Sequence, residues 1–324
     1  MPEPFVFITR KISQTALRRL EGVAQVEVWP QDDPPPYPVL LEKSATADGL
    51  LTLLTDRIDA ALIDAARNLK VISQDAVGFD NIDIAAATRR GIPVGNTPGV
   101  LTETTADFAW TLMMAAARRV VEADKEVRAG VWRPWGPDVL TGYDIYGATL
   151  GIIGFGRIGQ AMARRAKGFN MKILYSDPHC KPEAGEETGA ECVDLDELLA
   201  RADFVTLHTF LSPETYHLIG REQLQKMKPT AILVNTSRGP VVDPQALAWA
   251  LQNQVIAAAA LDVTEPEPIP NDSPLLKQDN LVITPHIASA SKATRQRMAE
   301  MAVENLLAGL KGEKLPYCAN PEVY

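Results

Sequence analysis

The sequence predicts an α/β protein with two parallel sheets, and three observations support this prediction. Short apolar runs alternate with helix-like segments along most of the 324 residues, a pattern typical of βαβ units. A glycine-rich turn follows one apolar run near the middle of the chain. The alternation starts again there more clearly than before, so we predict two α/β domains in series.

The first third of the chain contains the elements expected of one such sheet. Strands are predicted where apolar runs are short, and helices where helical spacing follows a cap residue. Residues 30–38 contain five prolines, which exclude a helix or the interior of a sheet, so we expect an extended loop there. The predicted strands are residues 6–8, 49–54, 69–73 and 92–96, and the predicted helices are residues 13–20, 59–67 and 84–90.

One long helix is predicted over residues 104–129, because this stretch contains neither glycine nor proline. Residues 132–147 contain both and are expected to form a loop. Beyond the loop, strands and helices alternate again, and a helix over about residues 292–310 ends the chain. The strands predicted in this part are residues 149–153, 171–175, 203–207, 231–234, 256–261 and 281–284.

Composition and charge exclude several classes of protein. Hydrophobic residues make up 46% and charged residues 23% of the chain, a balance typical of globular proteins. The net charge of -9 argues against a nucleic-acid partner. No apolar run is long enough to span a bilayer, and the first residues carry no secretory signal. We therefore expect a cytoplasmic protein with no membrane partner.

The three cysteines, Cys180, Cys192 and Cys318, are widely spaced and form no CxxC pair. An odd number leaves at least one thiol unpaired within the chain. We expect all three to be free thiols in a reducing cytosol, and not a disulfide framework or a zinc site. No metal site is predicted elsewhere in the chain.

The glycine-rich turn has the features of a dinucleotide-binding fingerprint. Gly154, Gly156 and Gly159 form GxGxxG between a strand and a helix, and the next strand ends at Asp177. Gly154 permits the tight turn, Gly156 lets the backbone approach a pyrophosphate, and Gly159 lets the helix lie close to the sheet. The amides of the first helical turn then face the phosphates, so we predict a dinucleotide site.

Asp177 also bears on which dinucleotide binds. A carboxylate at this place accepts hydrogen bonds from a ribose diol and repels a 2′-phosphate. No arginine follows directly, so we expect NAD to be preferred. NADP stays possible, because His179 and Lys181 lie close enough in sequence to soften that preference.

Arg238, Asp262 and His286 each come just after a predicted strand, and His208 ends another. A lone strand-end histidine is more often structural than catalytic. However, ligands collect at the carboxyl ends of the strands of an open α/β sheet. The shared placement therefore favours a functional role for this set.

Six motifs occur in order along the chain: AVGFDNID (76–83), VLTETTAD (100–107), GIIGFGRIGQA (151–161), NTSRGPVVD (235–243), LDVTEPEP (261–268) and TPHIASAS (284–291). As an ordered set they resemble the D-isomer-specific 2-hydroxyacid dehydrogenase family, and within it the glyoxylate/hydroxypyruvate reductases. The similarity covers nearly the whole chain. It implies reduction of a small 2-oxo acid, glyoxylate or hydroxypyruvate, to the D-2-hydroxy acid by NAD(P)H.

The resemblance also implies an architecture. Two Rossmann-like or flavodoxin-like domains are expected, with the cofactor domain inserted into the substrate domain. We place the substrate domain at residues 1–100 and 288–324 and the NAD(P)-binding domain at residues 101–287. A homodimer is expected, with contacts from the predicted helix 104–129 and the loop after it.

By the same resemblance, Arg238, Glu267 and His286 are the catalytic residues. The planar guanidinium of Arg238 suits the carboxylate and 2-oxo group of the substrate. His286 would protonate the carbonyl oxygen as hydride arrives. Glu267 would orient the imidazole and favour its charged form. It lies five residues after Asp262, as in the family motif, whereas Glu265 does not.

Further contacts are implied for the two ligands, including one between Asp262 and the nicotinamide carboxamide. Ala288 stands where the family usually has glycine. The residues expected at the substrate are Leu54, Val77, Gly78, Arg238 and His286. The residues expected at the cofactor are Thr105, Gly154, Gly156, Arg157, Ile158, Gly159, Asp177, His208, Thr236, Ser237, Arg238, Asp262, His286 and Ala288.

Alternatives remain open at this point. If the protein is an enzyme, one alternative is that its substrate is 2-ketogluconate, 3-phosphoglycerate or another 2-oxo or 2-hydroxy acid. A further alternative is that it oxidises phosphite. Val77 stands where we expect a lysine in the phosphite-oxidising subgroup. Outside the enzymes, an NAD-binding regulator similar to a corepressor is the alternative, because fold alone does not determine function.

Overall fold

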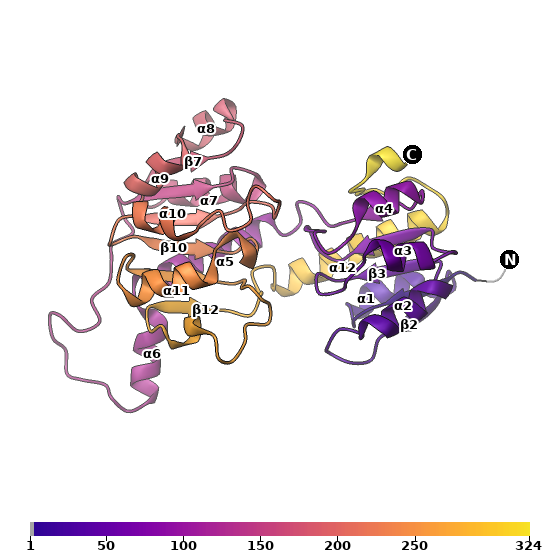
Figure 1. Cartoon of the computed structure of the whole chain (residues 1–324), viewed down its shortest axis with the longest axis horizontal. Helices are drawn as coiled ribbons and strands as arrows, with labels where there is room; N and C mark the ends of the chain where they lie inside the picture. Colours follow the sequence, from indigo (N-terminus) through magenta and orange to yellow (C-terminus); the bar gives the residue numbers. More distant parts are fainter. Residues whose placement is uncertain (1–2) are drawn as a thin grey trace. The chain divides into compact units, whose positions relative to one another are not determined.

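The computed structural model describes residues 3–324, which form two compact units (Figure 1). The chain passes from unit 1 to unit 2 after Leu101 and returns after Ser289. Unit 2 is therefore Thr102–Ser289, and Ala290–Tyr324 completes unit 1. In Figure 1 the yellow C-terminal helix accordingly lies among the indigo and purple elements of the first hundred residues. The sequence placed the two crossings near residues 100 and 287.

Unit 1 contains a five-stranded parallel sheet in the order β2-β1-β3-β4-β5. The last long helix, α12, packs on this sheet through buried apolar residues such as Val71 and Leu306. The Ser73 hydroxyl also donates to the backbone oxygen of Ala302 at 2.7 Å. The elements are β1 (Phe5–Ile8), α1 (Gln14–Leu17), η1 (Arg18–Leu20), β2 (Gln25–Val28), α2 (Tyr37–Thr46), β3 (Gly49–Thr52), α3 (Ala60–Ala65), β4 (Val71–Gln74), α4 (Ile84–Arg89), β5 (Val94–Gly95), α12 (Lys292–Leu310) and η4 (Pro321–Val323).

Unit 2 contains a seven-stranded parallel sheet in the order β12-β11-β10-β9-β6-β7-β8. The strand order reverses between β6 and β9, and ligands bind at such a switch point in open α/β sheets. The elements are α5 (Thr102–Ala117), α6 (Val120–Arg128), β6 (Thr149–Ile153), α7 (Arg157–Lys167), β7 (Lys172–Ser176), α8 (Pro182–Thr188), β8 (Ala190–Cys192), α9 (Leu195–Arg201), β9 (Phe204–Leu207), α10 (Arg221–Lys226), β10 (Ile232–Asn235), η2 (Gly239–Val241), α11 (Pro244–Gln252), β11 (Ala258–Leu261), η3 (Pro274–Lys277) and β12 (Leu281–Ile283).

The predicted α/β class with two parallel sheets is confirmed, but the prediction of one long helix over residues 104–129 was wrong. The segment predicted as a single helix is divided into α5 and α6, because Arg119 has a left-handed backbone with φ 52°. The Arg119 guanidinium donates twice to the Glu122 carboxylate, at 2.8 and 2.6 Å, which stabilises the start of α6. Pro38 lies in the first turn of α2, where the missing N–H group costs little. The predicted proline loop therefore ends at residue 36.

The prediction of three free thiols was also wrong. Cys180 and Cys192 form a disulfide, with Cα atoms 6.0 Å apart, and only Cys318 is a free thiol. The short strand β8 explains the contact, because it lies parallel to β7 and brings Cys192 beside the segment that follows β7. Cys192 follows Cys180 by 12 positions in the sequence. The cysteines therefore give no support for a reducing compartment.

Cys192→Ser is expected to lower the free energy of unfolding of unit 2 by about 3 kcal/mol, because the bond closes a short loop in the unfolded chain. Denaturant unfolding without reductant measures the change. Cys318→Ser is the matched control, since it removes a thiol that is not bonded, and we expect a change below about 1 kcal/mol. If both variants lost the same free energy of unfolding, the result would contradict a stabilising disulfide between Cys180 and Cys192.

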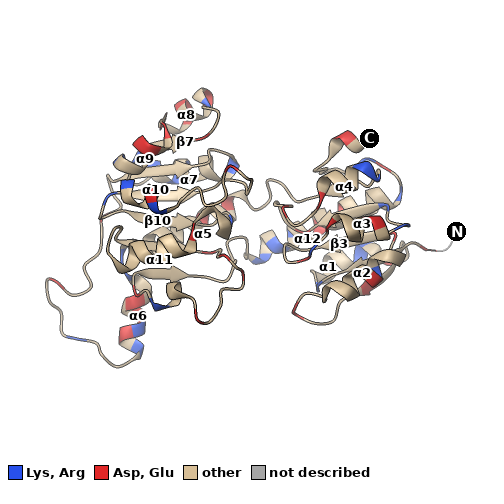
Figure 2. Ribbon diagram, in the orientation of Figure 1, with Lys and Arg blue, Asp and Glu red and all other residues tan. Residues whose placement is uncertain are grey.

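Lysine and arginine positions are interspersed with aspartate and glutamate positions along the ribbon of each unit (Figure 2). On α6, for example, Arg128 pairs with Asp124 at 2.8 Å. Such exposed pairs contribute little to stability. Within residues 3–324, no helix combines the length and apolar character needed to cross a membrane.

Candidate active site

The carboxyl ends of three neighbouring strands carry the predicted catalytic groups. Strands β10, β11 and β12 are adjacent and parallel. They are followed directly by the loops that contain Arg238, Asp262 and His286. Parallel strands end at the same edge of a sheet, so the order β12-β11-β10 brings these three loops together.

His286 contacts the predicted carboxylate. Its ring atom Nδ1 lies 2.6 Å from Glu267 Oε1, and both side chains are partly exposed, at 28% and 37%. Glu265 instead contacts His217 Nε2 at 2.6 Å. His286 has φ 54°, an uncommon backbone conformation for a residue with a side chain. With Nδ1 on the carboxylate, Nε2 is the ring atom that can exchange a proton with a ligand.

Asp262 fixes the loop that carries His286. This carboxylate is buried and accepts three hydrogen bonds: from the Thr284 hydroxyl (2.6 Å), the Ile287 amide (2.9 Å) and the Ala288 amide (2.7 Å). The backbone oxygen of Asp262 also accepts from the His286 amide at 2.8 Å. The sequence predicted a nicotinamide contact for Asp262 but missed this positioning role, as well as the part of Thr284.

Asn235, which the sequence pattern did not single out, shapes the turn that presents Arg238. Its Oδ1 accepts from the amide and hydroxyl of Ser237 at 3.0 and 2.8 Å. Its Nδ2 donates to the backbone oxygen of Arg238 at 2.8 Å. Arg238 is half-buried, and its Nη1 donates to the backbone oxygen of Ser237 at 2.8 Å. An asparagine at a strand end is a known turn signal.

Gly239 allows the loop of Arg238 to approach the loop of Glu267. A Cβ atom added at Gly239 would overlap the backbone oxygen and carbonyl carbon of Thr264. Real Cβ atoms do not come so close to a backbone, so any side chain here must push the two loops apart. The glycine after Arg238 is therefore a packing requirement of the site.

Gly239→Ala is expected to lower kcat/KM about 100-fold, because a shift of about 1 Å between reacting groups has an effect of that size. Gly220→Ala is the matched control. Its added Cβ would meet atoms only at 3.5 Å and beyond, an ordinary contact. Steady-state kinetics of both variants, with circular dichroism to check folding, provides the test. Equal activity of the two variants would show that the close approach is not needed.

The glycine turn has the geometry of a phosphate cradle. Gly154 has φ 88°, and its added Cβ would lie 2.6 Å from the backbone oxygen of His208. A Cβ atom added at Gly159 would overlap the backbone oxygen of Gly154. At Gly156, by contrast, no atom lies within 4 Å of the added Cβ, so there is open space in front of α7. The start of α7 has no side-chain cap, which leaves its first amides for a phosphate.

Two buried hydroxyls at the same edge also fit a bound dinucleotide. Thr209 Oγ1 and Thr236 Oγ1 have no hydrogen-bond partner within the described part of the chain. Buried polar atoms usually have one, so a ligand on this edge would satisfy them. Thr236 was predicted at the cofactor, and Thr209 was missed. His208 Nε2 lies 2.9 Å from Thr206 Oγ1, and burial lowers the pKa of His208 to about 3, so its ring is neutral.

Asp177 lies at the end of β7, beside the glycine turn. Its Oδ2 accepts from the Phe155 amide at 2.8 Å and from Lys181 Nζ at 2.8 Å, and its Oδ1 accepts from the His179 amide at 3.2 Å. Burial raises the pKa of Asp177, but Lys181 and the two amides outweigh burial and leave this pKa below its usual value. The carboxylate is therefore charged and already paired with a lysine.

The remaining predicted residues lie in two places. In unit 2, Thr105, Ser237 and Ala288 are buried, Ile158 is half-buried and Arg157 is exposed. In unit 1, Leu54 lies in the turn after β3, while Val77 and Gly78 lie in the loop after β4. That loop is anchored by Asn96 Nδ2 on the backbone oxygen of Val77 at 2.8 Å. The proposed ligand contacts of these residues stay predictions.

Comparison with known proteins gives consistent matches. The family model "D-isomer specific 2-hydroxyacid dehydrogenase, NAD binding domain" matches residues 110–288. Glyoxylate reductase from Korarchaeum cryptofilum is 56% identical over 322 residues, covering 99% of this chain and 97% of that protein. The crystal structure of TT0316 protein from Thermus thermophilus gives a TM-score of 0.92 at 48% identity, covering 97% and 99% of the two chains. The structure of NADPH-dependent glyoxylate/hydroxypyruvate reductase from Sinorhizobium meliloti, solved with NADP and malonate, gives a TM-score of 0.86 at 30% identity. This match covers 99% of this chain and 98% of that chain.

Proposed function

The chain belongs to the D-isomer-specific 2-hydroxyacid dehydrogenase family, and from this we propose that it is an NAD(P)H-dependent glyoxylate/hydroxypyruvate reductase. The product is the D-2-hydroxy acid, glycolate or D-glycerate. The observation that carries the proposal is the 2.6 Å contact between His286 Nδ1 and Glu267 Oε1. It lies on the sheet edge that also bears Arg238 and the glycine turn.

The catalytic roles follow from the charges at this edge. The Arg238 guanidinium binds the substrate carboxylate and polarises the 2-oxo group, since its planar donors match a carboxylate. The bound nicotinamide supplies the hydride. His286 Nε2 donates a proton to the carbonyl oxygen, and Glu267 holds the imidazole ring in place through its contact with Nδ1. The proposed substrate contacts of Leu54, Val77 and Gly78 rest on the family resemblance alone.

For the cofactor, we propose that NADH is preferred and NADPH is accepted. The Asp177 carboxylate accepts hydrogen bonds from an adenosine ribose and disfavours a 2′-phosphate. Gly154, Gly156 and the first turn of α7 would hold the pyrophosphate. The NADPH dependence of the Sinorhizobium meliloti relative makes this preference the most important detail to measure.

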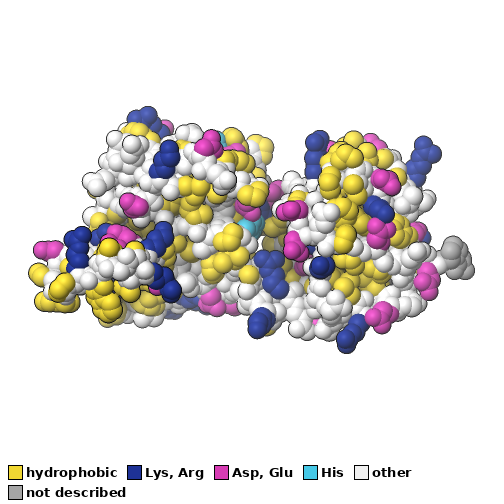
Figure 3. Space-filling model, turned by 90° about the horizontal axis from the view of Figure 1, so that it is seen from below, with side chains coloured by type: hydrophobic (Ala, Val, Ile, Leu, Met, Phe, Trp, Pro, Cys, Tyr) yellow, Lys and Arg dark blue, Asp and Glu magenta, His cyan; other side chains and the backbone are white. Residues whose placement is uncertain are grey.

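We propose that the protein is a homodimer. The loop after α6 exposes large apolar side chains, with Trp132 at 79% and Trp135 at 89%. Figure 3 shows hydrophobic side chains gathered at the far left of the view, where this loop lies. Exposed apolar groups of this size mark interaction surfaces. Sedimentation velocity should give twice the chain mass, and a monomer at micromolar concentration would contradict the proposal.

Initial-rate oxidation of NADH and NADPH with glyoxylate, hydroxypyruvate, pyruvate and 2-ketogluconate tests the activity. Fast turnover of glyoxylate or hydroxypyruvate is expected, with a higher kcat/KM for NADH. Turnover of 2-ketogluconate alone would show that the protein is a 2-ketogluconate reductase instead. Binding of NADH without turnover of any acid would favour a regulatory protein instead.

A further inference from the structure

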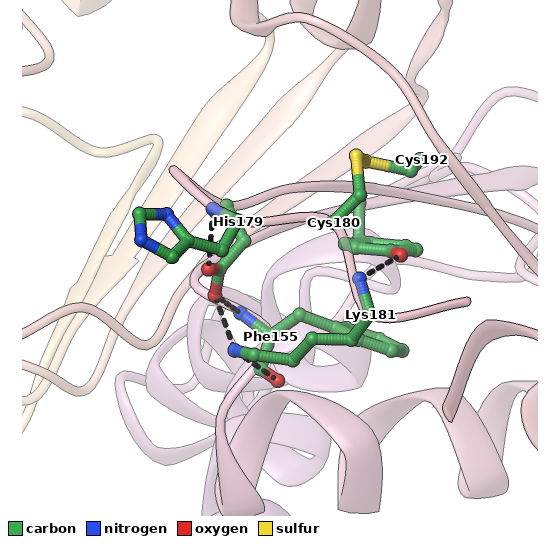
Figure 4. Close-up of a disulfide and its surroundings, with 7 residues drawn as sticks. Phe155, His179, Cys180, Lys181 and Cys192 are labelled. Carbon is green, nitrogen blue, oxygen red and sulfur yellow. Dashed lines mark hydrogen bonds and ion pairs between the residues drawn. A yellow bond between two sulfur atoms is a disulfide. The ribbon is translucent and has the colours of Figure 1, made fainter. Parts of the chain in front are cut away.

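The ion pair of Asp177 with Lys181 changes the charge that a cofactor meets. Lys181 Nζ lies 2.8 Å from Asp177 Oδ2 and donates to the backbone oxygen of Phe155 at 3.0 Å (Figure 4). The Asp177 side chain is 14% exposed and that of Lys181 is 38% exposed. The pair is therefore partly shielded from solvent, where charges are screened less than at an open surface.

The backbone of Lys181 is anchored on several sides. Its amide donates to the Tyr175 hydroxyl at 2.8 Å, and its backbone oxygen accepts from the Gly185 amide at 2.9 Å. The preceding residue, Cys180, is bonded to Cys192 at the end of β8. Figure 4 shows the disulfide and the lysine on the same short segment. Lys181 is thus held in place more firmly than an ordinary surface lysine.

We propose that Lys181 is a specificity-determining residue for the cofactor, because it sets how strongly Asp177 rejects a 2′-phosphate. The inference rests on the proposed function, in which Asp177 faces the adenosine ribose. A phosphate monoester carries a charge of about -1.5 to -2 at pH 7. An unpaired carboxylate repels it, whereas a carboxylate paired with an ammonium presents a net charge near zero. Ribose hydroxyls are neutral, so the lysine affects NADH much less.

Equilibrium binding of NADH and NADPH to the full-length protein, followed by nicotinamide fluorescence, tests this without turnover. Lys181→Met is expected to raise the Kd of NADPH about tenfold or more and to change the Kd of NADH less than about threefold. The selective loss should shrink in 1 M salt, which screens charges beyond about 3 Å. Lys172→Met is the matched control, because Lys172 is exposed at the opposite end of β7.

A double-mutant cycle gives a second readout. Asp177→Asn removes the repulsion but keeps the ammonium, so it should favour NADPH over NADH. Adding Lys181→Met to that variant should then remove most of the gain. This interaction between the two substitutions measures the coupling of the pair directly.

The outcomes separate the two claims. A selective loss of NADPH affinity in Lys181→Met, absent in Lys172→Met, supports the inference. Equal changes for both cofactors, or no change, would overturn it and leave the proposed function intact. Failure of the wild-type protein to bind either cofactor would instead overturn the proposed function.

Discussion

His286→Gln is expected to lower kcat for glyoxylate reduction by about 10²- to 10⁴-fold, the range for loss of a general acid. Glutamine keeps a polar side chain but cannot deliver a proton to the carbonyl oxygen. NADH binding should change much less than kcat, because the cradle formed by Gly154, Gly156 and α7 is not altered. Stopped-flow single-turnover rates and NADH titration measure the two effects separately.

His217→Gln is the matched control for this substitution. His217 also contacts a carboxylate, Glu265, at 2.6 Å, but it has no place in the proposed reaction. We expect it to retain most of the activity. If His217→Gln lost as much activity as His286→Gln, the assignment of the proton donor would be wrong. His208 is a poor alternative donor, because burial holds its pKa at about 3.

Arg238→Lys is expected to lower kcat/KM for glyoxylate about 100-fold. Lysine keeps the charge but loses the planar pair of donors, and each charge-assisted hydrogen bond is worth about 1.5–3 kcal/mol. Both KM and kcat should worsen, because the guanidinium binds the carboxylate and polarises the carbonyl group. Steady-state kinetics over a range of glyoxylate concentrations separates the two parameters.

Arg221→Lys provides the control. Arg221 lies on helix α10, and its guanidinium carbon lies 3.8 Å from the centroid of the Trp249 ring. This variant tests whether any arginine-to-lysine change in unit 2 reduces activity. Activity within about twofold of wild type is expected for Arg221→Lys. Near-normal kcat/KM in Arg238→Lys would remove Arg238 from the proposed site.

The sheet edge could be predicted from the sequence because its signals are local. Strand β10 is rich in apolar residues, and Arg238 comes three residues after it ends. The same holds for β12 and His286. Motif spacing then singled out Glu267 over Glu265, and the structure places Glu267 on His286. Periodicity and motif order were sufficient here because strand, turn and functional residue are neighbours in the chain.

Features that depend on packing between distant segments could not be predicted in this way. Strand β8 has only three residues, Ala190–Cys192, with no apolar run to reveal it. The disulfide with Cys180 was missed for that reason. The break between α5 and α6 at Arg119 is not marked by a glycine or a proline in the sequence. The hydrogen bonds of Asn235 and Asp262 likewise appear only when the loops are folded.

The most direct test of the central claim is the configuration of the product from hydroxypyruvate. The wild-type protein is incubated with hydroxypyruvate and excess NADH, and the glycerate is resolved by chiral chromatography. If Arg238 and His286 hold one face of the 2-oxo acid towards the nicotinamide, the product is D-glycerate alone. L-glycerate, a racemic mixture or no glycerate would contradict the account.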